Sequence, residues 1–133
     1  MGKKIMIVDD DKDLVESLTK VFSGNGYTVA AAHSSSEGLK TVLKEKPDLI
    51  ILDVTMETDT AGFEFAYQIR NKRETSRYKS IREVPIILLT AIAQVTNSRF
   101  SLNDKESFLP SVNDFINKPV KIDDLLAKVK RFI

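Results

Sequence analysis

The chain has 133 residues, enough for one domain, predicted over residues 1–133, and too few for two ordinary ones. A hydrophobic content of 42% and a charged content of 29% are typical of a soluble globular protein, and a formal net charge of +1 gives no reason to expect direct binding to nucleic acid or to a membrane. The absence of cysteine excludes disulfides and cysteine metal sites, and no apolar run reaches membrane-spanning length, so a cytoplasmic location is expected.

Short apolar runs alternate along the chain with stretches in which apolar residues recur at helical spacing. The runs predict strands over residues 5–8, 27–32, 48–53, 84–89 and 114–116. The helical stretches predict helices around residues 14–22, 39–43, 63–69, 93–109 and 123–132. Five strand–helix units with short connections predict an α/β fold in which helices cover both faces of a parallel sheet.

Polar residues mark the predicted beginnings of two of these helices. Ser35 or Ser36 can cap the second helix, which Pro47 closes. Asp123 or Asp124 opens the last one.

Charged and polar side chains follow the predicted strands at the point where each strand ends. Asp9 and Asp10 follow the first strand, and Asp53 ends the third. Thr90 follows the fourth strand and Lys118 comes after the fifth. Because the carboxyl ends of parallel strands meet at one edge of the sheet, these side chains are expected to lie together.

Three converging carboxylates repel one another unless a cation neutralises them. An all-oxygen acidic site suits a hard divalent cation, and Mg²⁺ is the predicted ion. The metal and Lys118 would then receive a phosphoryl group, whose oxygens could accept a hydrogen bond from Thr90. Asp53 is the candidate nucleophile in this arrangement and would form an aspartyl phosphate.

The residues at the strand ends together look like the receiver domain of two-component response regulators. They are Asp9-Asp10, Asp53, Thr90 and Lys118-Pro119. The likeness extends over almost the whole chain, and these elements in order at the ends of four strands are highly specific. It implies a flavodoxin-like (βα)5 fold, doubly wound around a five-stranded parallel sheet in the order 2-1-3-4-5.

The resemblance also implies roles for individual residues. Asp53 would accept phosphate from a partner histidine kinase or phosphotransfer protein. Asp10 would ligate Mg²⁺ directly and Asp9 through water, with the backbone carbonyl of Thr55 as a further ligand. Lys118 would pair with the phosphoryl group, across a cis bond to Pro119.

By the same resemblance, Thr90 and Phe115 occupy the positions whose hydroxyl and aromatic ring shift together on activation. The surface that changes would comprise the fourth helix, the fifth strand and the fifth helix, and would contact a downstream protein or a second copy of the chain. Thr55 and Ile92 would flank the approach of the water that hydrolyses the phosphate. Neither side chain is suited to hold that water, so slow self-dephosphorylation is expected.

Three segments depart from the usual pattern of the family. In the loop of residues 54–62, Glu57 stands where proline is usual, and Gly62 follows the acceptor by nine residues instead of eight. The segments 71–83 and 93–112 are longer than is typical. Because the last of these includes the region through which family members signal, the geometry of the output is left open.

Each residue singled out also has an ordinary explanation. The run Asp9-Asp10-Asp11 can cap the first helix, Thr90 can be a plain strand residue and Lys118 a solvated charge. Phe115 can be core packing alone. His33, the only histidine, is expected on the solvated surface away from the site. The basic residues of the 71–83 segment are expected to form a solvated loop, with a docking patch as the alternative.

Two other classes of function are alternatives to the receiver-domain hypothesis. A phosphorylation-independent interaction module of the same fold would keep the acids as relics. An enzyme of the haloacid dehalogenase type would need a second aspartate two residues after the nucleophile, where this chain has Thr55. The predicted function is therefore a Mg²⁺-dependent phospho-acceptor switch and not an enzyme acting on other molecules. Whether the chain acts alone or is part of a longer regulator is left open.

Overall fold

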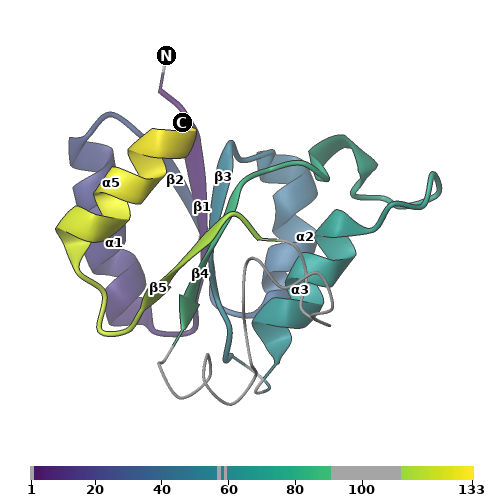
Figure 1. The fold of residues 1–133 in the computed structure, drawn as a ribbon, viewed down its shortest axis with the longest axis horizontal. Helices are drawn as coiled ribbons and strands as arrows, with labels where there is room; N and C mark the ends of the chain where they lie inside the picture. The colour runs from purple at the N-terminus through teal and green to yellow at the C-terminus, as the bar shows by residue number, and fades with distance from the viewer. Residues whose placement is uncertain (1, 57, 59, 91–111) are drawn as a thin grey trace.

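A computed structural model describes residues 2–56, 58, 60–90 and 112–133. Its described strands form one parallel sheet in the order β2-β1-β3-β4-β5, which confirms the predicted flavodoxin-like order (Figure 1). The strands are β1 (Lys4–Val8), β2 (Thr28–Ala32), β3 (Leu49–Asp53), β4 (Ile86–Thr90) and β5 (Asp114–Asn117).

Helices cover both faces of the sheet, so the molecule has three layers (Figure 1). The described helices are α1 (Lys12–Gly24), α2 (Ser35–Glu45), α3 (Ala61–Arg70), the short 3-10 helix η1 (Lys79–Ile81) and α5 (Ile122–Phe132). Helices α1 and α5 pack on one face, and α2 and α3 pack on the other. The helix predicted around residues 93–109 lies outside the described residues. None of the described helices is both long and apolar enough to cross a membrane.

The central strand β3 shows why the sequence of the strands is continuously apolar. All five of its residues are buried, because side chains alternate between two cores on opposite faces of the sheet. Ile50 and Leu52 pack toward α2 and α3, whereas Leu49 and Ile51 pack toward α1 and α5. A carboxylate at the end of such a strand is consequently held at a defined place.

Several predicted boundaries are corrected by local hydrogen bonding. Ser34, and not Ser35 or Ser36, caps α2, because its side chain accepts the amide of Glu37. Helix α5 begins at Ile122, which places Asp123 and Asp124 within its first turn.

Strand β4 begins two residues later than predicted. The amide of Val84 donates to Ile81 in a turn, and Pro85 has no amide proton for the sheet, so pairing by β4 itself starts at Ile86.

The start of β5 is fastened to α3 and β4. Asn113 Oδ1 accepts the amide of Ile86 at 2.9 Å and Arg70 NH2 at 3.0 Å, and Arg70 NH1 donates to the carbonyl of Arg82 at 2.6 Å. These contacts lie at the amino ends of the strands. They tie the segment before β4 to both the helix that precedes it and the last strand.

Candidate functional site

The acidic residues meet where β1 and β3 end side by side. Val8 is paired with Leu52, so the residues that follow in each strand, Asp9 and Asp53, are neighbours at one edge of the sheet. Oxygens of Asp9, Asp10 and Asp53 all lie within 4.8 Å of one another. Asp9 and Asp53 are 0% and 4% exposed, whereas Asp10 is exposed to solvent.

The first loop turns Asp9 inward and uses Asp11 as the cap of α1. Asp9 donates its amide to Ala32 at 3.0 Å, and its Oδ1 accepts the amide of Asp11 at 2.9 Å. Asp11 Oδ1 in turn accepts the amide of Leu14 at 3.1 Å. The three consecutive acids therefore have different surroundings, and the capping explanation applies to Asp11.

Lys118 reaches the same place from the end of β5. Its Nζ lies 3.3 Å from Asp9 Oδ2 and 3.3 Å from Asp53 Oδ1, so one ammonium group faces two buried carboxylates. Its amide donates to the carbonyl of Thr90 at 2.7 Å, which continues the pairing of β5 with β4. The peptide bond between Lys118 and Pro119 is cis.

The charges in this cluster shift the pKa values of its members. Burial, together with the nearby charges of Asp9 and Asp10, raises the pKa of Asp53 from the ordinary 3.8 to about 6, although Lys118 acts in the opposite direction. For Lys118, burial disfavours the charged form, but the carboxylates of Asp53 and Asp9 outweigh it and raise the pKa of the ammonium. One lysine thus does not neutralise three carboxylates.

A divalent cation fits the uncompensated negative charge. Three carboxylates within reach of one centre form an all-oxygen donor set, and exposed Asp10 leaves the cluster open to solvent. Thr55 lies two residues after Asp53 and is half-buried; its Oγ1 makes no hydrogen bond with any part of the chain that the structure describes. The residues present therefore suit Mg²⁺, which retains water ligands beside one or two carboxylates.

The structure brings some of the remaining predicted residues near the acids. Thr90 is buried at the end of β4, one position beyond Leu89, the partner of Asp53 in the sheet. Phe115 lies on β5 and packs against the core beneath α2 and α3. Ile92 falls outside the described residues.

Gly62 is a site residue whose role the sequence did not disclose. Its amide donates to the carbonyl of Val54 at 2.8 Å, and a Cβ on Gly62 would lie 2.2 Å from the backbone oxygen of Asp53. No side chain fits in that space, so glycine allows the start of α3 to contact the backbone of the acceptor strand. A glycine directly before the helix predicted around residues 63–69 is the available signal.

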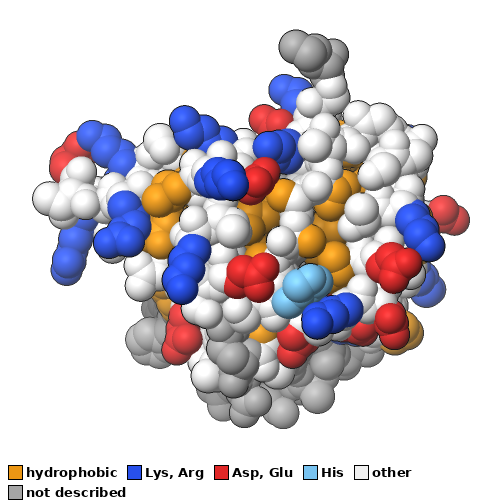
Figure 2. Space-filling model, turned by 180° about the vertical axis from the view of Figure 1, so that it is seen from behind, with side chains coloured by type: hydrophobic (Ala, Val, Ile, Leu, Met, Phe, Trp, Pro, Cys, Tyr) orange, Lys and Arg blue, Asp and Glu red, His pale blue; other side chains and the backbone are white. Residues whose placement is uncertain are grey.

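The expectation that His33 lies away from the site is wrong. Its Nδ1 is 3.2 Å from the backbone oxygen of Asp9, and the residue is half-buried. The residue after β2 must lie beside the residue after β1, because these strands are neighbours in the sheet. The single histidine is visible on the rear face among acidic and basic side chains (Figure 2).

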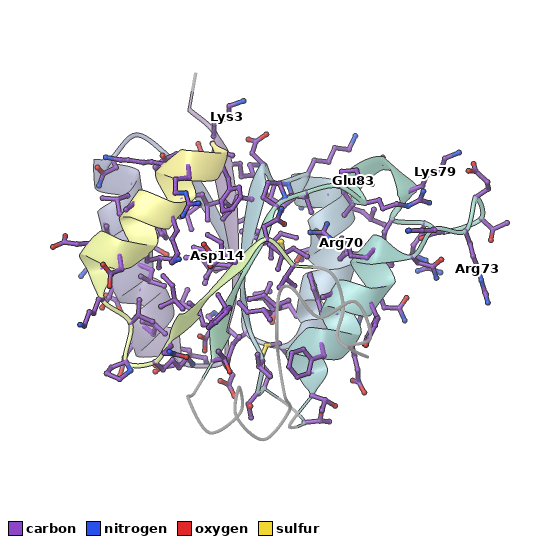
Figure 3. All side chains as sticks on the ribbon, viewed as in Figure 1. Lys3, Arg70, Arg73, Lys79, Glu83 and Asp114 are labelled. Carbon is purple, nitrogen blue, oxygen red and sulfur yellow. The ribbon has the colours of Figure 1, made fainter. Side chains whose placement is uncertain are left out.

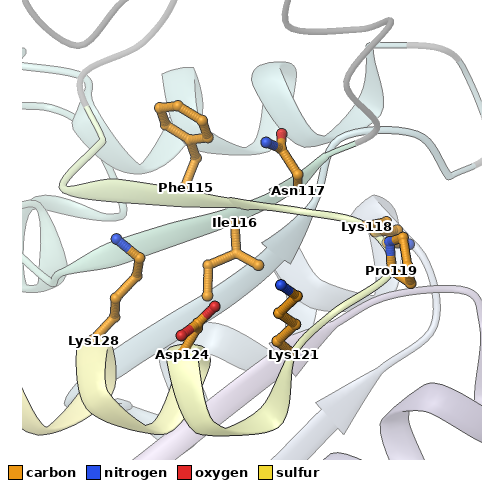
Figure 4. A pocket seen from close by; sticks show the side chains of 8 residues that line it. All are labelled: Phe115, Ile116, Asn117, Lys118, Pro119, Lys121, Asp124 and Lys128. Carbon is orange, nitrogen blue, oxygen red and sulfur yellow. The ribbon is translucent and has the colours of Figure 1, made fainter.

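A hollow of about 580 Å³ lies between β5 and α5 (Figure 4). Lys118 and Pro119 stand at one end of it, and Lys128 of α5 stands at the other. Ile116 points into the hollow, whereas Phe115 points to the opposite side of β5. The strand that delivers Lys118 to the acids thus also forms part of a surface.

Comparison with known proteins assigns this arrangement to a family. The profile of the response regulator receiver domain matches residues 5–130. The chain belongs to this family. The response regulator MprA of Mycobacterium ulcerans is 32% identical over 134 residues, which cover 100% of this chain and 51% of that protein. This chain therefore spans about half the length of this curated relative.

Solved structures agree with the family. The receiver domain protein of Methanospirillum hungatei, described as CheY-like, has 30% identity and a TM-score of 0.77, covering 98% of this chain and 93% of that one. A putative response regulator from Chloroflexus aurantiacus has 29% identity and a TM-score of 0.76, covering 99% and 98%. CheY4 of Vibrio cholerae has 27% identity and a TM-score of 0.74, covering both chains completely.

Membership fixes the general class of function. Receiver domains are signalling domains of two-component systems and not classical enzymes. They interact with histidine kinases or phosphotransfer proteins, and they bind Mg²⁺ at an acidic pocket of the kind that Asp9, Asp10 and Asp53 form here.

Proposed function

We propose that this receiver domain is a Mg²⁺-dependent phospho-acceptor switch in which Asp53 takes the phosphoryl group from a histidine kinase or phosphotransfer protein. The observation that carries the proposal is the convergence of three carboxylates and one ammonium group at the end of β3. Asp53 is the member that ends the central strand β3, all of whose residues are buried.

In the proposed reaction, one carboxylate oxygen of Asp53 attacks the phosphorus of a phosphohistidine. The oxygen–phosphorus bond forms while the phosphorus–nitrogen bond breaks, and the histidine nitrogen leaves with its electron pair. Lys118 lies within 3.3 Å of Asp53 and supports the proposal because its ammonium can follow the charge onto the phosphoryl oxygens.

Four groups are proposed to hold the metal. Asp10 and Asp53 would ligate it directly, Asp9 through water, and Thr55 through its backbone carbonyl. When bound, Mg²⁺ supplies positive charge that lowers the repulsion between the incoming phosphoryl group and the acids. The bond of Asp9 Oδ1 to the amide of Asp11 supports the indirect role, because that oxygen is already engaged.

For signalling, Thr90 and Phe115 are proposed to form the switch. Thr90 is buried at the end of β4, next to the strand that ends in Asp53, and Phe115 lies on the adjacent strand β5. A shift of Thr90 toward a phosphoryl group would change the packing of β5 and of the face that it forms with α5. That face would contact a downstream protein or a second copy of the chain.

Phosphorylation by a small donor tests the acceptor. Incubated with Mg²⁺ and acetyl phosphate, the protein should gain one phosphoryl group that is labile to base, as measured by intact mass. Asp53→Asn should gain none, because an amide is not a nucleophile. Asp13→Asn, which removes an acid from the exposed first turn of α1, is the matched control and should be labelled like the parent.

Full labelling of Asp53→Asn would disprove the assignment of the acceptor. If the parent itself remained unlabelled under conditions in which it binds Mg²⁺, the phosphorylation-independent interaction module would replace the proposed switch.

A further inference from the structure

The segment of residues 71–83 joins α3 to β4 and projects from the body of the molecule (Figure 1). It contains five basic and two acidic side chains, so its formal charge is +3 in a chain whose formal net charge is +1. The remainder of the chain then carries a formal charge of −2. Positive charge is therefore concentrated on one projecting element.

Not every cation of this segment is neutralised. Lys79 forms an ion pair with Glu74. Arg82 is half-buried, and its NH2 donates to the backbone oxygen of Arg73 at 3.0 Å. By contrast, Arg73 and Arg77 are exposed, and neither forms an ion pair with any residue in the described ranges. Arg73 and Lys79 both point outward from the segment (Figure 3).

The two arginines line one small hollow of about 230 Å³. Hydroxyl and amide side chains complete its wall: Gln68, Asn71, Thr75 and Ser76. Ser76 Oγ accepts the amide of Tyr78, which leaves the hydroxyl proton available to a ligand. The hollow is thus lined by two arginines together with hydroxyl and amide side chains.

The backbone around the hollow is held in place. The amide of Arg73 donates to Asn71 Oδ1 at 2.9 Å, and its carbonyl accepts the amide of Ser76 at 3.1 Å. Tyr78 is 7% exposed and anchors the segment through a contact of its hydroxyl with the carbonyl of Leu39 at 3.4 Å. Less ordering is therefore needed when a ligand binds than for an unstructured loop.

The hollow lies at the opposite edge of the sheet from the acidic site. The segment precedes β4, at the amino ends of the strands, whereas Asp53 and Lys118 lie at their carboxyl ends. A molecule bound to the hollow would leave the acceptor edge open to a phosphodonor.

We propose that the hollow of Arg73 and Arg77 binds carboxylate side chains of an acidic segment in a partner protein. Planar guanidinium groups pair with carboxylates through two parallel hydrogen bonds, and the hollow has room for acidic side chains but not for a folded element. The amides of Arg73, Ser76 and Tyr78 already have acceptors, so these three backbone donors would not contribute to binding a phosphate. The net negative charge of the remaining chain disfavours a long polyanion such as nucleic acid.

Fluorescence anisotropy of a labelled, glutamate-rich peptide with the full chain at low salt tests the proposal. Replacing both arginines, as Arg73→Gln with Arg77→Gln, should weaken binding about tenfold. The matched control, Lys40→Gln with Lys44→Gln, removes the same charge from exposed positions of α2 and should leave binding unchanged. Arg73→Lys with Arg77→Lys should bind more weakly than the parent, because lysine keeps the charge but not the paired donors.

If replacing the two arginines by glutamine and replacing Lys40 and Lys44 by glutamine weakened binding equally, the proposal would be overturned. The interaction would then be general electrostatic attraction. The proposal would also be overturned if single-stranded DNA, or the peptide with phosphoserine in place of glutamate, bound more tightly through the same two arginines. Labelling by acetyl phosphate should be unaffected in the arginine variant, and Asp53→Asn should bind the peptide normally. Failure of this proposal is therefore separate from failure of the phospho-acceptor assignment.

Discussion

At the scale of single residues, the folded site holds carboxylates close together without fully neutralising their charge. Asp53 is buried beside Asp9 and close to Asp10, and Lys118 must serve two carboxylates at once. The pKa of Asp53 is consequently raised to about 6. The ionised site therefore lowers the stability of the metal-free fold at neutral pH. Binding of a cation, or a role in accepting a phosphoryl group, would account for such a site.

The pH dependence of stability should expose this cost in metal-free buffer. Because the folded pKa of Asp53 is above its unfolded value of 3.8, the native state binds more protons between about pH 4 and 6. The free energy of unfolding should therefore be higher at low pH, and it should fall by up to about 3 kcal/mol as the pH rises and Asp53 ionises. Urea unfolding should show that Asp53→Asn removes this fall and is more stable than the parent at pH 7. If the free energy of unfolding changed with pH identically in both proteins, the assignment of the raised pKa to Asp53 would be contradicted.

Gly62 provides a second test at the residue scale. Gly62→Ala places a Cβ against the backbone oxygen of Asp53, so α3 and the acceptor loop must move apart. We expect a loss of more than about 2 kcal/mol in the free energy of unfolding, together with slower phosphorylation. Gly24→Ala is the matched control, because a Cβ at that exposed helical position meets nothing within 4 Å and should stabilise the protein by up to about 1 kcal/mol. Equal stability of the two variants would show that the close contact is not needed.

At the scale of elements, β5 is the strand on which the site and the surface meet. One end is fastened by Asn113, which bonds β4 and α3, and the other by the amide of Lys118 on Thr90. Asp114 links the strand to α5, because its carboxylate lies 2.8 Å from Lys128 and 3.9 Å from Arg131. A change at Lys118 can therefore be transmitted along β5 to the helix that packs on it.

Hydrogen exchange should detect that transmission. With Mg²⁺ and beryllofluoride as a phosphoryl mimic, amides from Asp114 to Lys128 are expected to change their exchange rates, whereas β2 at the other end of the sheet should change least. Asp53→Asn should abolish the change. An unaltered pattern over β5 and α5 in the parent, under conditions in which the mimic binds, would refute the proposed switch.

At the scale of the whole molecule, the two edges of the sheet have opposite character. The carboxyl edge gathers acids around Asp53, and the amino edge carries the positively charged 71–83 segment. The rear face shows acidic and basic side chains interspersed around small apolar patches (Figure 2). A fold with this arrangement can present a cation site and an anion site at the same time.

Mg²⁺ should stabilise the whole fold by mass action. At a concentration ten times its dissociation constant, the free energy of unfolding should rise by about 1.4 kcal/mol, and the melting temperature with it. Asp10→Asn should lose most of this gain, while its metal-free form should be at least as stable as the parent because one repulsive charge is gone. Asp13→Asn should keep the full gain. A full gain in Asp10→Asn would exclude Asp10 as a ligand.

The order of elements and the gathering of acids could be predicted from the chain alone. Alternating strands and helices with short connections require a parallel sheet, and parallel strands carry the residues that follow them to one edge. Asp9, Asp53 and Lys118 needed only to be located at strand ends for their convergence to be expected, and the distances of 3.3 Å from Lys118 agree with it.

The finer features depend on contacts between residues that are remote in the sequence. Ser34 was missed as a cap because three adjacent serines offer the same hydroxyl, and only the backbone direction selects one. The position of His33 is not evident locally, because its neighbour Asp9 follows a different strand, β1. Gly62 is required because a Cβ at this position would lie 2.2 Å from a backbone oxygen, and no local pattern encodes that crowding. Composition and periodicity determine which elements form, whereas close packing in three dimensions decides which atoms meet.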